Sequence, residues 1–222
     1  MPSLTILAGP NGAGKTRNTD LLLTAGLLPT FPVDLDLLTN QAIDDLPHSF
    51  IGTDARLAKL VDRLFYNYCI DAIQNGKDFC YECNFRKDQL KYVGLFEEAG
   101  YELILVYFLL DSIGQSEQRV NYRVKHQNGR FVDLASITEN FTQGLANLDN
   151  HYQDFNRVLI IDSSQDNYEK TIYPLNIQVD ISQTGINCYT RDFPTVNLKA
   201  WLPKLAKLVS LNPENSELSF PS

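Results

Sequence analysis

The chain has 222 residues and a mass of 25.2 kDa, so it can bury a substantial core without disulfide bonds. Its 19 basic and 27 acidic residues give a net charge of −8, which argues against a protein that wraps nucleic acid, because such binding rests on neutralising phosphates. A hydrophobic content of 44% with 21% charged residues excludes a disordered chain.

The longest apolar stretch, near Leu103–Leu110, is far shorter than the roughly 20 residues of a membrane span. The N-terminus shows neither the basic region nor the cleavage site of an export signal. We therefore expect a cytoplasmic protein without a membrane partner, with its four cysteines as reduced thiols. Cys80 and Cys83 have the spacing of a metal-binding pair, but no second pair or histidine cluster follows, which favours two buried thiols.

Short apolar runs predict strands, and apolar residues three and four apart predict helices. In chain order, the predicted elements are a strand at Leu4–Ala8, a helix at Gly14–Ala25, a strand at Phe31–Asp36, a helix at Asp54–Asn75, a strand at Phe79–Glu82, a helix at Lys87–Ala99, and strands at Tyr101–Leu110 and Val158–Asp162. Residues 112–148 are polar and helical. Beyond them, Ile177–Ile181 and Ile186–Tyr189 predict a hairpin across Thr184-Gly185, and Leu198–Val209 predicts a last helix.

This alternation predicts an α/β fold of three layers, with a mostly parallel five-stranded sheet and a ligand at the carboxyl ends of its strands. Asp36, Glu82 and Asp111 follow or end predicted strands, so we expect them near one cleft. We expect one domain over residues 1–222, with a core over 1–165 and a small hairpin and helix addition over 166–222.

One motif carries a specific chemistry. Gly9, Pro10, Asn11, Gly12, Ala13, Gly14, Lys15 and Thr16 match the phosphate-binding pattern G-x-x-x-x-G-K-[ST], between a predicted strand and a predicted helix. Glycines let backbone N–H groups turn inward around an anion, and the helix adds its positive end. Lys15 is expected on the outer phosphates of a nucleotide and Thr16 on Mg²⁺. A chance glycine-rich turn is the alternative, which the correct flanks disfavour.

The remainder of the chain points to phosphoryl transfer rather than to a motor or a GTPase. The Ser-Gly-Gly-Gln and Asn-Lys-x-Asp signatures of those two classes are absent from the sequence. A kinase needs a proton acceptor, Mg²⁺ ligands and cations over the transferring group. Asp36 is the candidate base, and Glu82 is a candidate for Mg²⁺ or acceptor binding. Arg119, Arg123 and Arg130 are candidates for a closing lid, with a solvated helix face as the alternative.

With this loop and these candidate residues, the sequence resembles the zeta-toxin-like P-loop kinases, a family that includes toxins phosphorylating UDP-N-acetylglucosamine. The resemblance runs from about Ser3 to Ser164. Its matching segments are Ala8–Thr16, Val33–Leu38, Phe79–Asn84, Arg119–Val124, Gly129–Val132 and Phe141–Leu148.

The resemblance implies a P-loop kinase fold with an arginine-bearing helical lid. It places Asp36 on the general base, Lys15 on the phosphates, Thr16 on Mg²⁺, and Glu82 with Asn84 on a substrate-binding motif, Glu82 also serving the metal. The lid arginines of the family cluster where this chain has Arg119, Arg123 and Arg130.

The chain departs from the family at three places. Glu139-Asn140-Phe141 stands where an Arg-Arg-Phe triplet is common, Cys83 stands at the middle of the Glu-x-Thr/Asn motif, and Gln127-Asn128-Gly129-Arg130 replaces a Gly-Gly-His turn. We therefore expect ATP- and Mg²⁺-dependent transfer of the γ-phosphate to a hydroxyl of a small molecule, a nucleotide sugar being one candidate. The alternative is a low-turnover ATP-binding module or ATPase acting through a partner. A neutralising antitoxin-like protein is a partner that the sequence leaves open.

Overall fold

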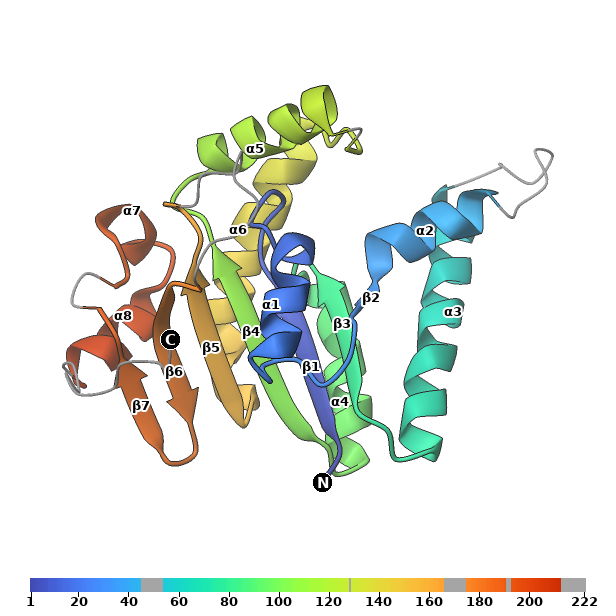
Figure 1. Cartoon of the computed structure of the whole chain (residues 1–222), viewed down its shortest axis with the longest axis horizontal. Coiled ribbons are helices and arrows are strands. Elements are labelled where there is room, and N and C mark those ends of the chain that lie inside the picture. Colours follow the sequence, from blue (N-terminus) through green and yellow to red (C-terminus); the bar gives the residue numbers. More distant parts are fainter. Residues whose placement is uncertain (45–53, 128, 166–174, 191–192, 213–222) are drawn as a thin grey trace.

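The protein is described from a computed structural model, which covers residues 1–44, 54–127, 129–165, 175–190 and 193–212. A seven-stranded sheet runs through the molecule in the order β2-β3-β1-β4-β5-β6-β7 (Figure 1). The strands are β1 Ser3–Ala8, β2 Val33–Asp34, β3 Phe79–Cys83, β4 Glu102–Leu109, β5 Arg157–Asp162, β6 Ile177–Ser182 and β7 Gly185–Cys188.

The first five strands are parallel, and their register sets the level of the functional loops. Ala8 pairs with Cys83 of β3 and with Tyr107 of β4. Gly9 and Asn84 therefore leave the sheet at the same edge and at the same height. This edge is the carboxyl end of the parallel strands, where α/β sheets bind their ligands.

Helices cover both faces of the sheet, which gives the expected three layers. The helices are α1 Thr19–Thr24, α2 Leu35–Asp44, α3 Asp54–Gln74, α4 Lys87–Glu98, α5 Ile113–His126, α6 Leu134–His151, α7 Val196–Lys199 and α8 Pro203–Ser210, with 3₁₀ turns at Thr16–Asn18 and Tyr152–Asp154. In Figure 1, α1 lies in front of the sheet, α4 and α6 lie behind it, and α5 crosses above the carboxyl ends of the strands.

The α/β fold and its parallel core are confirmed, but the strand count of five is wrong. The predicted hairpin exists, with Ile181 paired to Ile186, and it joins the sheet because β6 pairs antiparallel with β5. Arg157 of β5 strengthens this edge with two hydrogen bonds to the Asp180 carboxylate, at 3.1 and 2.9 Å. The hairpin therefore extends the main sheet instead of forming a separate addition.

Two helical regions also differ from the predicted elements. The second strand ends at Asp34, whose carboxylate accepts a hydrogen bond from Leu37 N at 3.1 Å and so starts α2 early. The last helix is split into α7 and α8, because Pro203 occupies the first turn of α8, a position that needs no N–H donor.

Aromatic side chains join α3 and α4 to β3. Phe65 of α3 packs edge-on against Tyr81 of β3 and Tyr92 of α4, with ring centroids 5.1 and 4.6 Å apart. The Asp62 carboxylate on α3 accepts hydrogen bonds from Lys91 and from the Tyr92 hydroxyl. Such packing fixes the position of β3, and with it the polar residues at the end of that strand.

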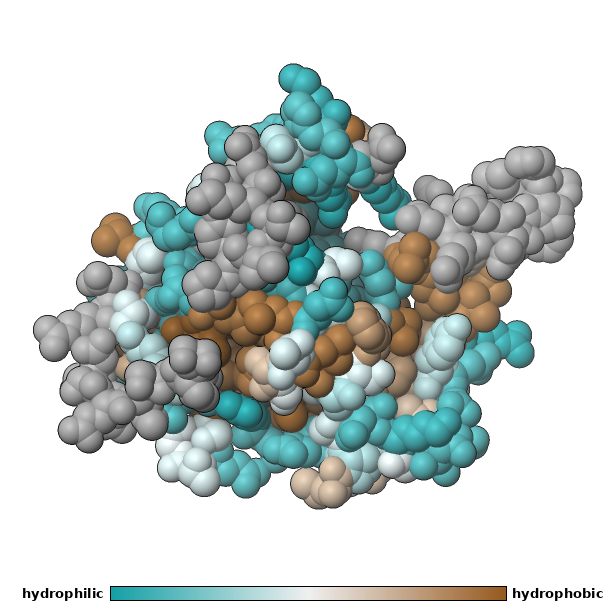
Figure 2. All heavy atoms as spheres, viewed as in Figure 1, coloured by the Kyte–Doolittle hydropathy of each residue, from teal (hydrophilic) through white to brown (hydrophobic). Residues whose placement is uncertain are grey.

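The surface is hydrophilic over α5, and a hydrophobic band crosses the middle of the visible face below it (Figure 2). Within the described part of the chain, none of the helices combines the length and the hydropathy that a membrane span needs.

Candidate active site

A cavity of about 620 Å³ opens at the carboxyl edge of the sheet. It is enclosed by the phosphate-binding loop, the ends of β2 and β3, helix α5 and the start of α6. Five of the nine arginines in the sequence line it, in a chain whose net charge is −8. They are Arg17, Arg86, Arg119, Arg123 and Arg130. Cations gathered in one hollow of an acidic protein indicate an anionic ligand.

The phosphate-binding loop has the backbone that its motif requires. Gly9 has a φ of +141°, and a Cβ there would overlap with the carbonyl oxygen of Phe108 on β4. The loop is also bonded to the turn after β5, because Ser163 Oγ donates to Ala13 O at 2.8 Å. Residues Asn11–Arg17 line the cavity, so the loop faces it.

Three polar side chains meet beside the loop. Thr16 Oγ1 lies 3.1 and 2.9 Å from the two carboxylate oxygens of Glu82. Lys15 Nζ donates to Gly9 O at 2.8 Å and lies 3.9 Å from Glu82 Oε1. A hydroxyl and a carboxylate at this separation are the hard oxygen ligands that suit Mg²⁺.

Arg119 is a buried part of the scaffold around the loop. Its guanidinium donates to Ser163 O at 2.6 Å, to Gly12 O at 3.3 Å and to Ser164 O at 3.3 Å. Its side chain is 6% exposed. Arg119 therefore lines the cavity, but its donors are directed at backbone carbonyls of the loop and of the turn after β5.

Arg123 and Arg130 occupy the other side of the cavity mouth. The half-buried Arg123 carries an Nε that is shielded from solvent and has no hydrogen-bond partner among the described residues. Its aliphatic stem lies over Gly129, where a Cβ would overlap with it. Arg130 is exposed in the segment between α5 and α6. Arg119 Nε also has no described hydrogen-bond partner, but the terminal nitrogens of Arg119 are bonded to backbone carbonyls. A buried donor without a partner, such as Arg123 Nε, is suited to an anionic ligand.

The three acidic candidates from the sequence differ in their position relative to the cavity. Glu82 lines the cavity. Asp36 lies in the first turn of α2, next to the cavity-lining Leu35 and Leu37, while its side chain lies outside the described residues. Asp111 does not belong to the site. Its carboxylate accepts hydrogen bonds from Thr195 Oγ1 and Asn197 Nδ2, both at 2.6 Å, and so holds the C-terminal region.

Asn84 lines the cavity, and so do several residues that the sequence analysis did not single out as site residues. Arg17 and Arg86 line the cavity, and so do Tyr122 and Asn140. Arg86 follows Asn84 by two residues and forms an ion pair with Asp88 at 3.2 Å. The signal for Arg86 was its place just after a strand that ends at the carboxyl edge of the sheet.

The cysteines are free and buried, as expected. Burial raises the pKa of Cys69 and of Cys83 to about 12, so both stay protonated thiols at neutral pH. No group of three or more metal-ligating His, Cys, Asp or Glu side chains occurs among the residues that the structure describes.

Comparison with solved structures supports the fold. A Chloroflexus aurantiacus protein of proposed kinase function is 18% identical, with a TM-score of 0.52 over 76% of this chain and 90% of that one. A structure of the PezAT toxin-antitoxin system of Streptococcus pneumoniae is 16% identical, with a TM-score of 0.53 over 96% and 88%. The AvrRxo1-ORF1:AvrRxo1-ORF2 complex, solved with sulphate ions and with ATP, is 14% identical, with a TM-score of 0.61 over 98% and 66%.

These likenesses establish a shared P-loop kinase-like architecture. No curated protein matches the sequence. The sequence model of the zeta toxin family matches residues 53–178, a segment that starts after the phosphate-binding loop and includes Glu82 and all three lid arginines. Because the match spans more than half of the 222 residues, the chain belongs to the zeta toxin family.

Proposed function

We propose that the protein transfers the γ-phosphate of ATP to a hydroxyl group of a small molecule, with Mg²⁺. The observation that carries the proposal is the cavity that joins Lys15 and Thr16 of the phosphate-binding loop to Glu82 and to a set of arginines. Membership of the zeta toxin family and the ATP-bound structural neighbour support it.

The loop binds the triphosphate through inward N–H groups. Lys15 Nζ now donates to Gly9 O and Pro10 O, at 2.8 and 3.3 Å, and it exchanges these carbonyls for phosphate oxygens on nucleotide binding. Thr16 and Glu82 are the residues that would hold Mg²⁺, and their paired oxygens fit that ion. Bound there, the metal neutralises charge on the phosphates.

Arg123 stabilises the transferring group. Its buried donor sits in the cavity wall, and phosphoryl transfer builds charge on equatorial oxygens that such a donor can bind. Arg130 provides a second, exposed cation at the mouth. Arg119 acts one step further away, by holding Gly12 and the turn after β5 in place.

Asp36 is proposed to accept the proton of the acceptor hydroxyl. Its backbone stands at the start of α2, between two residues that line the cavity. Asn84, in the turn after β3, is proposed to bind the acceptor. An Asp36→Asn variant should bind ATP like the parent and lose transfer, whereas loss of ATP binding would assign Asp36 a structural role.

The test is a transfer assay with γ-labelled ATP, Mg²⁺ and a library of nucleotide sugars, sugars and nucleosides. Lys15→Ala should lower transfer by about 10²–10³-fold, the usual effect of removing one preorganised charge stabiliser. Lys199→Ala is the matched control, because Lys199 is exposed on α7, outside the residues that line the cavity. Transfer at the parental rate by Lys15→Ala would contradict the proposal.

A low-turnover ATP-binding protein is the second candidate, since Glu139 and Asn140 stand at the cavity without the arginines common in the family. Tight ATP binding without any labelled product would favour it. One structural neighbour comes from a toxin–antitoxin system, which supports a protein partner that blocks the site. Co-purification with the product of an adjacent gene tests that partner.

A further inference from the structure

One face of α6 contacts both the phosphate-binding loop and the turn after β3. Asn140, Gly144 and Asn147 are four and three residues apart, a spacing that places them on the same side of a helix. One end of this stripe meets the phosphate-binding loop. The other end meets the turn between β3 and α4, which follows Glu82 and carries Asn84.

The first contact is between two buried amides. Asn140 Nδ2 donates to Asn11 Oδ1 at 2.8 Å, and each side chain is 8% exposed. Asn11 belongs to the phosphate-binding loop. Because a buried amide that loses its partner is costly, this bond restrains where the loop can lie.

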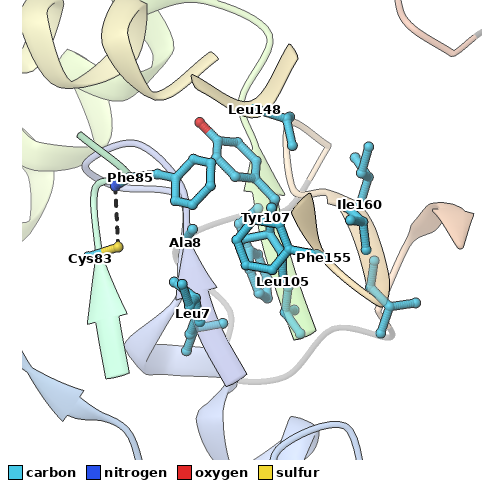
Figure 3. Close-up of a cluster of buried hydrophobic side chains, with 14 of the residues drawn as sticks. Leu7, Ala8, Cys83, Phe85, Leu105, Tyr107, Leu148, Phe155 and Ile160 are labelled. Atoms are coloured by element: carbon cyan, nitrogen blue, oxygen red, sulfur yellow. Dashed lines mark hydrogen bonds between the residues drawn. The ribbon is translucent and has the colours of Figure 1, made fainter. Parts of the chain in front are cut away.

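The second contact holds a turn of unusual backbone. Phe85 has a φ of +61°, the one positive value for a non-glycine residue within the described ranges. Asn147 Nδ2 donates to Phe85 O at 2.8 Å, and Phe85 N donates to Cys83 Sγ at 3.3 Å. The Phe85 ring packs edge-on against Tyr107, with centroids 5.8 Å apart (Figure 3). A strained residue persists only where its surroundings fix it, and α6 supplies part of that restraint.

The centre of the stripe lies directly on the turn. A Cβ at Gly144 would lie 2.7 Å from Tyr107 Oη and 2.9 Å from Asn84 O. The Tyr107 hydroxyl points towards α6 in Figure 3. The helix backbone thus approaches the turn more closely than any residue with a side chain would allow.

We propose that α6 sets the spacing between the phosphate-binding loop and the turn after β3, with Asn140 and Asn147 as positioning residues for the nucleotide and the metal. The inference rests on the proposed function in one respect, that the cavity binds ATP with Mg²⁺. Asn140 acts on the phosphates through Asn11. Asn147 acts on the metal ligand Glu82 through the backbone of Phe85.

The experiment is a calorimetric titration with ATP, once in EDTA and once with Mg²⁺. Asn140→Ala should weaken ATP binding about five- to tenfold in both buffers, the loss of one buried hydrogen bond. Asn147→Ala should bind metal-free ATP within about twofold of the parent and lose most of the affinity that Mg²⁺ adds. Asn150→Ala is the control, because Asn150 is an exposed asparagine of α6 that contacts Lys204 instead of the site.

A cycle with Asn11→Ala, Asn140→Ala and the double variant separates positioning from general destabilisation. A positioning bond predicts that the double variant binds ATP no more weakly than the worse single variant. If the folded fraction of each variant binds ATP and responds to Mg²⁺ as Asn150→Ala does, the inference is overturned. Failure of the proposed function looks different, because the parent and Lys15→Ala would then bind ATP equally or not at all.

Discussion

Arg119 and Arg123 are one helical turn apart on α5, and the structure predicts opposite consequences for their loss. In Arg119→Ala, three backbone carbonyls lose a donor, at 2.6, 3.3 and 3.3 Å. A hydrogen bond to a charged group contributes about 1.5–3 kcal/mol. The two longer bonds are weak and removal of a buried cation relieves desolvation, so we expect a net loss of about 2–4 kcal/mol.

For a chain of this length, 1 kcal/mol shifts the melting temperature by about 2–4 °C, so Arg119→Ala should melt roughly 4–16 °C below the parent. Arg123→Ala removes a half-buried side chain whose Nε has no described partner, and it should melt within about 2 °C of the parent while losing transfer. Circular dichroism melts without nucleotide measure both. Arg119→Lys should recover only part of the loss, because one amine cannot reach all three carbonyls. Equal melting of Arg119→Ala and the parent would refute the assignment.

Three further predictions concern other parts of the molecule. Gly129→Ala should lower transfer as Arg123→Ala does and leave the melting temperature unchanged, since the added Cβ overlaps with the Arg123 stem; unaltered transfer would contradict this. Because burial raises the pKa of Cys69 and Cys83 to about 12, a thiol reagent at pH 8 should modify them only after denaturation, and rapid labelling of the native protein would show that they are accessible. Although partial burial acts to raise it, hydrogen bonds from α4 hold the pKa of Asp62 below 3.8, so stability present above that pH is lost as the pH falls further. The difference in free energy of unfolding between the parent and Asp62→Asn should therefore shrink below about pH 3.8. A difference that grows there would contradict a lowered pKa for Asp62.

The phosphate-binding loop was predictable because its geometry is local. Gly9, which has a φ of +141°, and Lys15 belong to one short continuous segment, so the motif alone predicts the loop. The approach of Glu82 to Thr16 was also predictable, since parallel strands end at one edge of the sheet. The sequence thereby predicted the phosphate-binding loop and the carboxylate that lies beside it.

The incorrect predictions concern residues whose partners come from segments far away in the sequence. Asp111 looked like an acid at the same edge, but its partners Thr195 and Asn197 lie 84 and 86 residues away. The roles of Arg119 and Arg123 depend on which carbonyls and which glycine they meet in space, and no helical spacing reveals this. Helix α2 was missed because Asp34 caps it directly after two residues of strand.

We propose above all that this cavity binds a nucleoside triphosphate and its metal beside an acceptor. The most direct measurement is a crystal structure with Mg²⁺ and a non-hydrolysable ATP analogue. We predict that Lys15 Nζ leaves Gly9 O for the outer phosphates and that Thr16 and Glu82 oxygens approach the metal. A nucleotide bound elsewhere, with Lys15 still on Gly9 O and Glu82 still on Thr16, would contradict the account.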